Sequence, residues 1–261
     1  MRMPCIPGIL LVLFIHACQP GAQPAAEATV AEDTSLALEH RWFPAREKSG
    51  RPPVLFLLHG YGSHEADLAG IAQQIDPRYA VVAVRAPITL QPGAYAWYHL
   101  QWEQGQVVGY DAEGARNARQ QLTRFIDQVV ADHQANPEKV VLLGFSQGAI
   151  MSLEVALTAP EKVCGIAMMS GLLNDHLRQD RVAEERLQGM DILVTHGTED
   201  AVIPVEKARI CQQFLDSLPV QLHYQEYPGG HTITADAMQR AFDWTTGLLD
   251  ASSPSIKTES R

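Results

Sequence analysis

The residues with the clearest potential for chemistry form the motif Gly-Phe-Ser-Gln-Gly at positions 144–148. The motif follows an apolar run at 140–143 and precedes a segment with helical spacing at 149–157. A serine between small residues at a strand-to-helix turn is typical of a nucleophile elbow, because the sharp turn lifts its hydroxyl to the edge of the sheet. The alternative is an ordinary tight turn that carries a solvated serine. The strand-turn-helix context favours the first interpretation and predicts that Ser146 is a nucleophile.

A serine hydroxyl is a poor nucleophile at neutral pH and needs a base. In the fold that uses this elbow, the order along the chain is serine, acid, histidine. His231 follows two glycines and precedes the final predicted helix, so a loop can bring its ring over Ser146, whereas His223 lies within a predicted strand. The base also needs a carboxylate that fixes its tautomer. Asp200 and its neighbour Glu199 both lie on the loop after the apolar run at 192–195.

A second loop has the composition of an oxyanion hole, the pair of amides that stabilises a negatively charged tetrahedral intermediate. Leu-His-Gly-Tyr-Gly at 58–62 follows another apolar run, and its glycines let the backbone approach a ligand closely. We expect one donor to be the amide of Gln147, directly after the nucleophile, and the other to be the amide of Tyr61. His59 lies on the same loop, where its position favours a structural role over that of the base.

The elements that position these residues alternate between strands and helices. Continuous apolar runs predict buried parallel strands at 54–58, 79–84, 140–143, 163–168 and 192–195. Helical spacing predicts helices at 113–132, 149–157, 204–218 and 234–249. This alternation predicts an α/β fold with a mostly parallel central sheet and helices on both faces. Residues 36–43 are expected to form an edge hairpin or to pair with the strand at 54, and residues 171–188 leave no room for a large cap domain.

Composition and charge narrow the class of protein. The chain has 261 residues, of which 46% are hydrophobic and 19% are charged, which fits a single domain that we place at 35–250. Its net charge of −10 and the absence of a Lys/Arg cluster argue against a nucleic-acid partner. No Cys/His spacing suggests a metal site, and the predicted chemistry needs no cofactor. Cys164 and Cys211 either pair or are buried as small hydrophobic side chains.

The N-terminus has the pattern of an export signal. Arg2 precedes an apolar run at 9–15, which is shorter than the roughly 20 residues of a membrane-spanning helix. We therefore expect a signal peptide at 1–17 of the lipoprotein type, because the residues up to Cys18 resemble a bacterial lipobox. Cys18 is then lipidated, and the protein is exported, as a membrane-anchored lipoprotein or in the periplasm. The alternatives are ordinary signal cleavage nearby and a retained apolar N-terminus. A flexible tether at 18–34 and a disordered tail at 251–261 complete the chain.

Taken together, four motifs resemble the phospholipase/carboxylesterase family of the α/β-hydrolase superfamily, which includes acyl-protein thioesterases. These motifs are Leu-His-Gly-Tyr-Gly, Gly-Phe-Ser-Gln-Gly, His-Gly-x-x-Asp-x-Val-x-Pro and Gly-Gly-His, and the resemblance covers about 35–249. The resemblance implies that Asp200 rather than Glu199 is the acid, and that Trp97 matches a family tryptophan. The chain departs from the family pattern at Tyr61 and along the loop at 86–114, and most members are intracellular.

The loop at 87–110 is rich in aromatic side chains, and two interpretations of it are open. Trp97 and Tyr98 either line an apolar pocket for the substrate or pack locally over the sheet. In both cases the sequence predicts a serine hydrolase that cleaves carboxylic esters through an acyl-enzyme, as a carboxylesterase, lysophospholipase or thioesterase. Its partner is then a small-molecule or lipid ester, and its oligomeric state is open. The alternatives are a peptidase on the same fold and a non-catalytic ligand-binding protein on a hydrolase scaffold.

Overall fold

The computed structural model describes residues 38–47 and 50–250. The predicted signal peptide at 1–17, the tether at 18–34, the tail at 251–261 and the lipidation of Cys18 lie outside the described residues. These four expectations therefore stay predictions.

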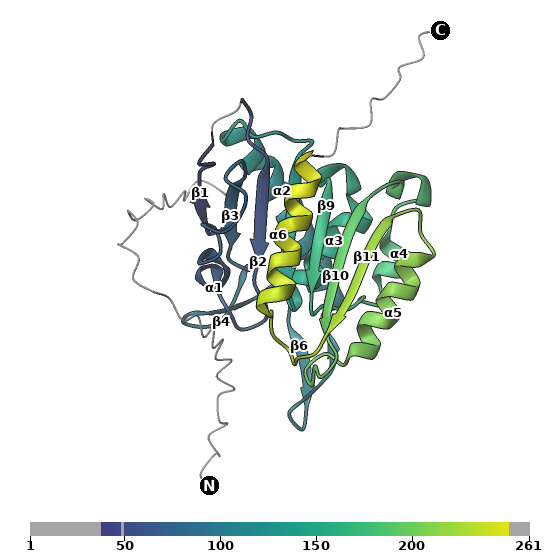
Figure 1. Ribbon diagram of the computed structural model, residues 1–261. Coiled ribbons are helices and arrows are strands. Elements are labelled where there is room, and N and C mark those ends of the chain that lie inside the picture. The colour runs from purple at the N-terminus through teal and green to yellow at the C-terminus, as the bar shows by residue number, and fades with distance from the viewer. Residues whose placement is uncertain (1–37, 48–49, 251–261) are drawn as a thin grey trace.

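One parallel sheet organises the described part of the chain (Figure 1). Its strands occur in the order β1-β3-β2-β8-β9-β10-β11, and all neighbours are parallel except β1 and β3. The bounds are β1 (His40–Phe43), β2 (Val54–Leu58), β3 (Ala80–Val84), β8 (Val140–Phe145), β9 (Gly165–Met169), β10 (Asp191–Gly197) and β11 (Gln221–Tyr227). Every residue of β2, β3, β8 and β9 is buried, which explains why these strands are continuous apolar runs in the sequence.

The first strand is placed differently from both sequence-based alternatives. β1 lies at the edge of the sheet and pairs antiparallel with β3, with His40 opposite Val84, and not with β2. Both sides of β2 are already occupied by β3 and β8. Because the crossover from β2 through α1 places β3 on the outer side of β2, the outer edge of β3 is free to pair with β1.

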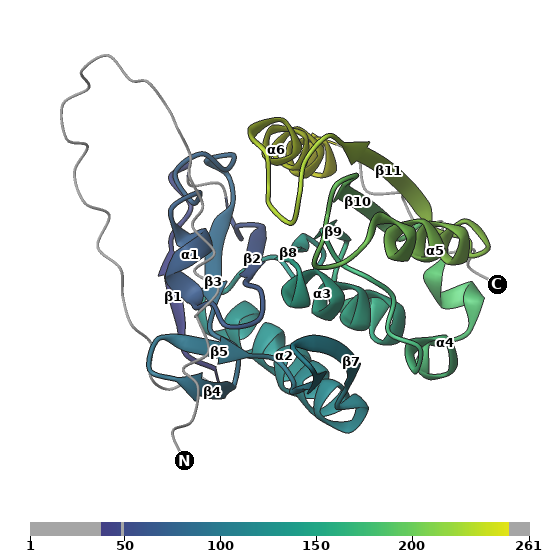
Figure 2. The same ribbon diagram turned by 90° about the horizontal axis from the view of Figure 1, so that it is seen from below.

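Helices cover both faces of this sheet, as predicted (Figure 2). α1 (Glu65–Ala69) and α6 (Ala235–Asp250) pack on one face. α2 (Ala112–Asp132), α3 (Gln147–Thr158) and α5 (Val205–Asp216) pack on the other. α2 buries only one stripe of apolar side chains, whereas α3 is buried on nearly all sides because it lies between the sheet and α2.

The carboxyl ends of the parallel strands carry the connections that matter for function. The connection from β3 to α2 folds into two hairpins, β4 (Ile88–Gln91) with β5 (Ala94–Ala96) and β6 (Leu100–Glu103) with β7 (Gln106–Tyr110). Short helical turns at η1 (Pro160–Lys162), α4 (Leu177–Asp180) and η2 (Glu184–Leu187) are the remaining elements. The fold is therefore that of an α/β-hydrolase without a large cap in the described ranges. Within these ranges, no helix combines the length and the apolar character needed to span a membrane.

Candidate active site

Ser146 occupies a strained turn between β8 and α3. Its backbone has φ 54° and ψ −117°, a conformation that non-glycine residues adopt rarely. The turn is tight because a Cβ atom on Gly144 would lie 2.2 Å from the carbonyl oxygen of Gly148. A Cβ atom on Gly148 would lie 2.0 Å from the carbonyl oxygen of Leu58. The two glycines of the motif are thus required by close backbone contacts, and the turn is the predicted nucleophile elbow.

The structure brings Ser146, His231 and Asp200 into one hydrogen-bonded chain. The Nε2 atom of His231 lies 2.9 Å from Oγ of Ser146, and its Nδ1 atom lies 2.7 Å from Oδ2 of Asp200. A carboxylate only accepts hydrogen bonds, so in the neutral imidazole the proton lies on Nδ1, and this N–H donates a hydrogen bond to Asp200. Nε2 is then unprotonated and accepts a hydrogen bond from the serine hydroxyl. This tautomer is the one that a general base for Ser146 requires.

Asp200 is held as an ionised carboxylate. Its side chain is fully buried, and Oδ1 accepts hydrogen bonds from the amides of Val202 (2.9 Å) and Ile203 (2.8 Å). Burial alone raises the pKa of Asp200, but hydrogen bonds from His196, His231 and the Ile203 amide outweigh burial and hold that pKa well below its usual range. The carboxylate therefore stays charged at neutral pH.

The neighbouring Glu199 is exposed, so the buried position beside the base belongs to Asp200. Close backbone contacts also fix the two loops that carry the acid and the base. A Cβ atom on Gly197 would lie 2.4 Å from the carbonyl oxygen of Gly229, on the loop that carries His231. The amide of Glu199 donates to that same carbonyl at 2.9 Å. The Asp200 loop and the His231 loop are thus joined through their backbones.

The predicted oxyanion hole lies against the nucleophile. A Cβ atom on Gly60 would lie 3.2 Å from Cβ of Ser146, so this loop passes directly over the serine. Gln147 is the first residue of α3, where amides have no acceptor within the helix. Among the described residues, no backbone carbonyl accepts a hydrogen bond from the amide of Gln147 or from the amide of Tyr61. Both amides are therefore available to an oxygen atom bound near Ser146.

The side chain of Gln147 has a role that the sequence did not reveal. Its Oε1 accepts from the amide of Trp97, and its Nε2 donates to the carbonyl of Tyr98, both at 2.9 Å. The indole N–H of Trp97 donates to the carbonyl of His59 at 3.0 Å. The 97–98 segment therefore binds both sides of the oxyanion hole. Trp97 and Tyr98 are 0% and 1% exposed, which matches the local-packing interpretation of these side chains better than that of pocket walls.

His59 stabilises the oxyanion loop and does not contact Ser146. Its Nδ1 donates to the carbonyl of Gly60 at 2.8 Å, and its Nε2 accepts from the amide of Ala86 at 3.0 Å. Burial lowers the pKa of His59, which keeps the ring neutral. This arrangement agrees with the structural role expected from its position in the sequence.

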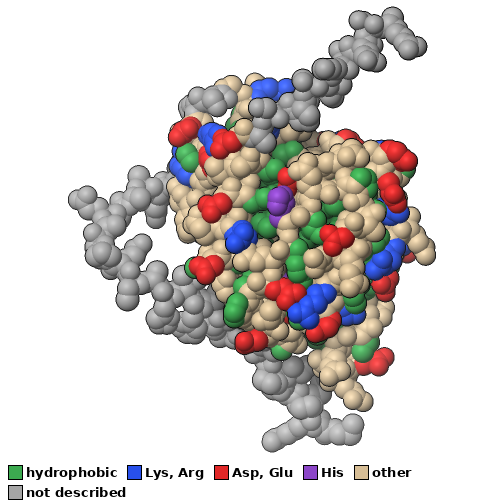
Figure 3. Space-filling model, turned by 45° about the vertical axis from the view of Figure 1, so that its right-hand side comes forward, with side chains coloured by type: hydrophobic (Ala, Val, Ile, Leu, Met, Phe, Trp, Pro, Cys, Tyr) green, Lys and Arg blue, Asp and Glu red, His purple; other side chains and the backbone are tan. Residues whose placement is uncertain are grey.

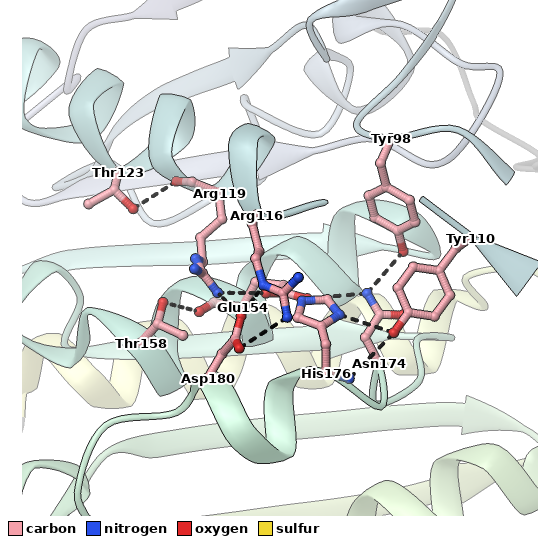
Figure 4. Close-up of polar contacts among 10 residues, drawn as sticks. All are labelled: Tyr98, Tyr110, Arg116, Arg119, Thr123, Glu154, Thr158, Asn174, His176 and Asp180. Atoms are coloured by element: carbon pink, nitrogen blue, oxygen red, sulfur yellow. Dashed lines mark hydrogen bonds and ion pairs between the residues drawn. The ribbon is translucent and has the colours of Figure 1, made fainter. Parts of the chain in front are cut away.

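A buried charged network lies behind the site, and the sequence did not predict it (Figure 4). The carboxylate of Glu154, on α3, is fully buried, and Nη1 of Arg119 lies 3.3 Å from its Oε2. Its Oε1 accepts from Asn174 at 3.2 Å and lies 2.9 Å from Nε2 of His176. His176 also contacts the hydroxyl of Tyr110 at 3.0 Å. The network therefore ties α3 to α2, to the end of β7 and to the loop after β9.

Three observations bear on the nucleic-acid, metal and disulfide expectations from the sequence. Figure 3 shows acidic and basic side chains interspersed on one face, without a continuous basic patch there. Between residues 38 and 250, apart from 48 and 49, no group of three or more His, Cys, Asp or Glu side chains is arranged to hold a metal ion. Cys164 and Cys211 are both free, and burial raises the pKa of each thiol, to about 11 and about 12.

Comparisons with known proteins agree with this geometry. Residues 45–248 match the sequence profile of the Phospholipase/Carboxylesterase family. Acyl-protein thioesterase 1 of Saccharomyces cerevisiae is 29% identical over 217 residues, which are 75% of this chain and 92% of the relative. Carboxylesterase SOBER1 of Arabidopsis thaliana is 28% identical over 64% of this chain and 75% of its own. A carboxylesterase from Mesorhizobium loti has the same fold, with a TM-score of 0.71 at 23% identity over 84% of this chain and 99% of that one.

Proposed function

The chain belongs to the phospholipase/carboxylesterase family and is a carboxylic ester hydrolase, and we propose that Ser146, His231 and Asp200 form the catalytic triad with which it cleaves its ester. The observation that carries this proposal is the continuous chain of hydrogen bonds from Asp200 through His231 to Ser146, at 2.7 Å and 2.9 Å. The strained backbone of Ser146 and the tautomer of His231 support it. A non-catalytic protein with this fold would not require a strained serine backbone or an imidazole in this tautomer.

The first half of the reaction forms an acyl-enzyme. Oγ of Ser146 attacks the carbonyl carbon of the ester while Nε2 of His231 takes the hydroxyl proton. The carbonyl oxygen becomes an oxyanion, which the amides of Tyr61 and Gln147 stabilise. Asp200 stabilises the imidazolium that forms. The bond to the leaving alcohol or thiol then breaks, and the leaving group departs with the proton from His231.

The second half releases the acid. Water enters the place of the leaving group and gives a proton to Nε2 of His231 as its oxygen attacks the acyl carbon. A second oxyanion forms against the same two amides. It collapses with return of the proton to Oγ of Ser146, and the free carboxylic acid leaves. The same steps apply to an oxygen ester and to a thioester, because His231 can protonate either leaving group.

The names of the relatives support a class of substrate, and the N-terminal sequence supports a location. Relatives carry the names acyl-protein thioesterase and carboxylesterase, so a carboxylic ester or thioester, including the ester of a lipid, is the substrate that we propose. We further propose that the protein is exported and anchored to a membrane through a lipid on Cys18. Cys18→Ser should then release the protein from the membrane fraction. Unchanged partitioning of that variant would refute the anchor and leave the enzyme assignment intact.

The experiment that tests the function is turnover of nitrophenyl esters of increasing acyl length by the full chain in detergent. We expect hydrolysis by the native protein, none above background for Ser146→Ala, and unchanged hydrolysis for Ser217→Ala, which removes an exposed hydroxyl on the far end of α5. Labelling of native protein by a fluorophosphonate, with no labelling of Ser146→Ala, identifies the nucleophile directly. Folded native protein that neither turns over any ester nor takes the label would support the non-catalytic alternative.

A further inference from the structure

His196 is a second imidazole that contacts the carboxylate of Asp200, on the same oxygen atom, Oδ2, as His231. It is the penultimate residue of β10, and its side chain is fully buried. Its Nε2 atom lies 2.8 Å from the carbonyl oxygen of Ile203 and 3.3 Å from Oδ2 of Asp200. The loop that carries the acid thus closes back onto the ring of His196.

The contacts of His196 define its protonation. A carbonyl oxygen only accepts hydrogen bonds, so Nε2 must carry a proton in order to bond Ile203. The Nδ1 atom is buried and has no hydrogen-bond partner among the described residues. A proton on Nδ1 would therefore be a buried donor without an acceptor, on a ring that also carried a charge. These contacts favour the tautomer of His196 that carries its proton on Nε2.

We propose that His196 is a positioning residue whose Nε2–H, shared between the carbonyl of Ile203 and Oδ2 of Asp200, fixes the catalytic carboxylate and moderates its pull on His231. This inference rests on the proposed function, in which Asp200 orients the base. Oδ1 of this carboxylate accepts from two amides, and Oδ2 accepts from His231 and lies 3.3 Å from Nε2 of His196.

The second imidazole changes the charge that His231 experiences. A donor on Oδ2 takes up part of the negative charge on the atom that also accepts from His231 Nδ1. The imidazolium of His231 is then stabilised less than it would be beside a carboxylate that lacked this donor. His196 therefore weakens the electrostatic support that Asp200 gives to the imidazolium of His231.

The other titratable and charged groups near His196 and Asp200 are already paired or neutral. Across β11, Glu226 is in register with His196, and its two carboxylate oxygens accept from Arg209 of α5 at 2.8 Å and 2.7 Å. Tyr227, also on β11, is the other titratable neighbour of Asp200, and its pKa is raised, chiefly by burial, so that it stays neutral. Among the described residues, the only ion-pair partners of Asp200 are His196 and His231.

The test compares two variants of the full chain by the pH dependence of kcat/KM for a nitrophenyl ester. His196→Phe keeps a ring of similar shape and removes the donor. His196→Gln places an amide N–H near the position of Nε2 and removes the imidazole. Loss of the donor should strengthen the attraction between Asp200 and the imidazolium of His231, so the acidic limb of the profile should move to higher pH in His196→Phe by about 0.5–1 unit. His196→Gln should restore the native limb.

The possible results separate the role of His196 from the proposed function. An acidic limb in His196→Phe that coincides with the native limb overturns the proposal, and so does an equal shift in both variants. A native chain without Ser146-dependent hydrolysis overturns the proposed function instead. Should the Phe variant fail to fold, ¹⁵N NMR of the native protein with labelled histidine gives the same decision. We expect His196 to remain neutral with its proton on Nε2 while His231 titrates; a protonated His196 in that range refutes the proposal.

Discussion

Replacing Asp200 with asparagine removes one charge and changes the direction of a hydrogen bond. The carboxylate accepts from two amides on Oδ1 and from His231 on Oδ2, which also lies 3.3 Å from Nε2 of His196. Asparagine keeps one acceptor oxygen, which the amides of Val202 and Ile203 require. Its NH2 group then faces the Nδ1–H of His231 across 2.7 Å. Two donors cannot share that contact, so the ring must change to the tautomer with its proton on Nε2, which no longer accepts the proton of Ser146.

This reasoning predicts the size of the effect. An imposed wrong tautomer lowers kcat by about 10⁴-fold in a serine protease, and we expect a similar loss for Asp200→Asn. That loss corresponds to about 5 kcal/mol of transition-state stabilisation, at about 1.4 kcal/mol for each factor of ten. The substrate binds before the tautomer matters, so KM should change little by comparison.

The assay is burst and steady-state turnover of a short-chain nitrophenyl ester, with thermal denaturation to show that each variant is folded. The matched control is Glu199→Gln, which makes the same chemical change on the exposed neighbouring side chain and should leave kcat unchanged. A folded Asp200→Asn protein that keeps more than about a tenth of native kcat would contradict the reasoning. An equal loss in Glu199→Gln would move the role of the acid to Glu199.

Four further substitutions, at three positions, test the supports of the site by ester turnover and thermal denaturation. Gly60→Ala places a Cβ atom 3.2 Å from Cβ of Ser146, and we expect kcat to fall at least about 10-fold with little change in Tm; native kcat would refute the close approach of this loop. Trp97→Phe removes the hydrogen bond to the carbonyl of His59 while keeping an aromatic ring, and should lower kcat by up to about 10-fold, whereas an unchanged kcat would show that the loop needs no such anchor. Glu154→Leu should lower the free energy of unfolding by about 3–5 kcal/mol, because it removes the buried acceptor of Arg119 and Asn174. Glu154→Gln should lower the free energy of unfolding less, because its amide oxygen still accepts a hydrogen bond. Equal stability of the two variants would contradict a role for Glu154 as a buried acceptor.

The hydrogen-bonded arrangement of Ser146, His231 and Asp200 could be anticipated because much of what it requires is local in the sequence. The elbow needs glycines next to Ser146, a requirement that the motif displays directly, and the chain order then leaves His231 as the base. The choice between Asp200 and Glu199 as the acid could not be made from local sequence. The two residues are adjacent on a loop, and only tertiary packing determines which carboxylate is buried beside the base. In the sequence that choice rested on the resemblance to the family.

Other features could not be predicted because they depend on contacts between distant segments. The pairing of β1 with β3 follows from which edges the parallel strands leave free, and the alternating pattern at 36–43 contains no information about that partner. Glu154 lies on a helix whose buried face extends nearly all round, and composition alone would place a glutamate in solvent. The contacts of Gln147 with the 97–98 segment likewise join residues about fifty positions apart.

The network around Glu154 also constrains how this chain can evolve. Its buried carboxylate receives its partners from α2 and from the loop after β9, which are encoded far apart in the gene. Loss of Glu154 takes an acceptor from Arg119, Asn174 and His176 at once, and such a change is destabilising by itself, whereas replacement of a buried charged set by apolar side chains of similar volume is often neutral. Arg119, Glu154 and His176 should therefore be inherited or lost together, and lineages that carry only part of the set should be rare.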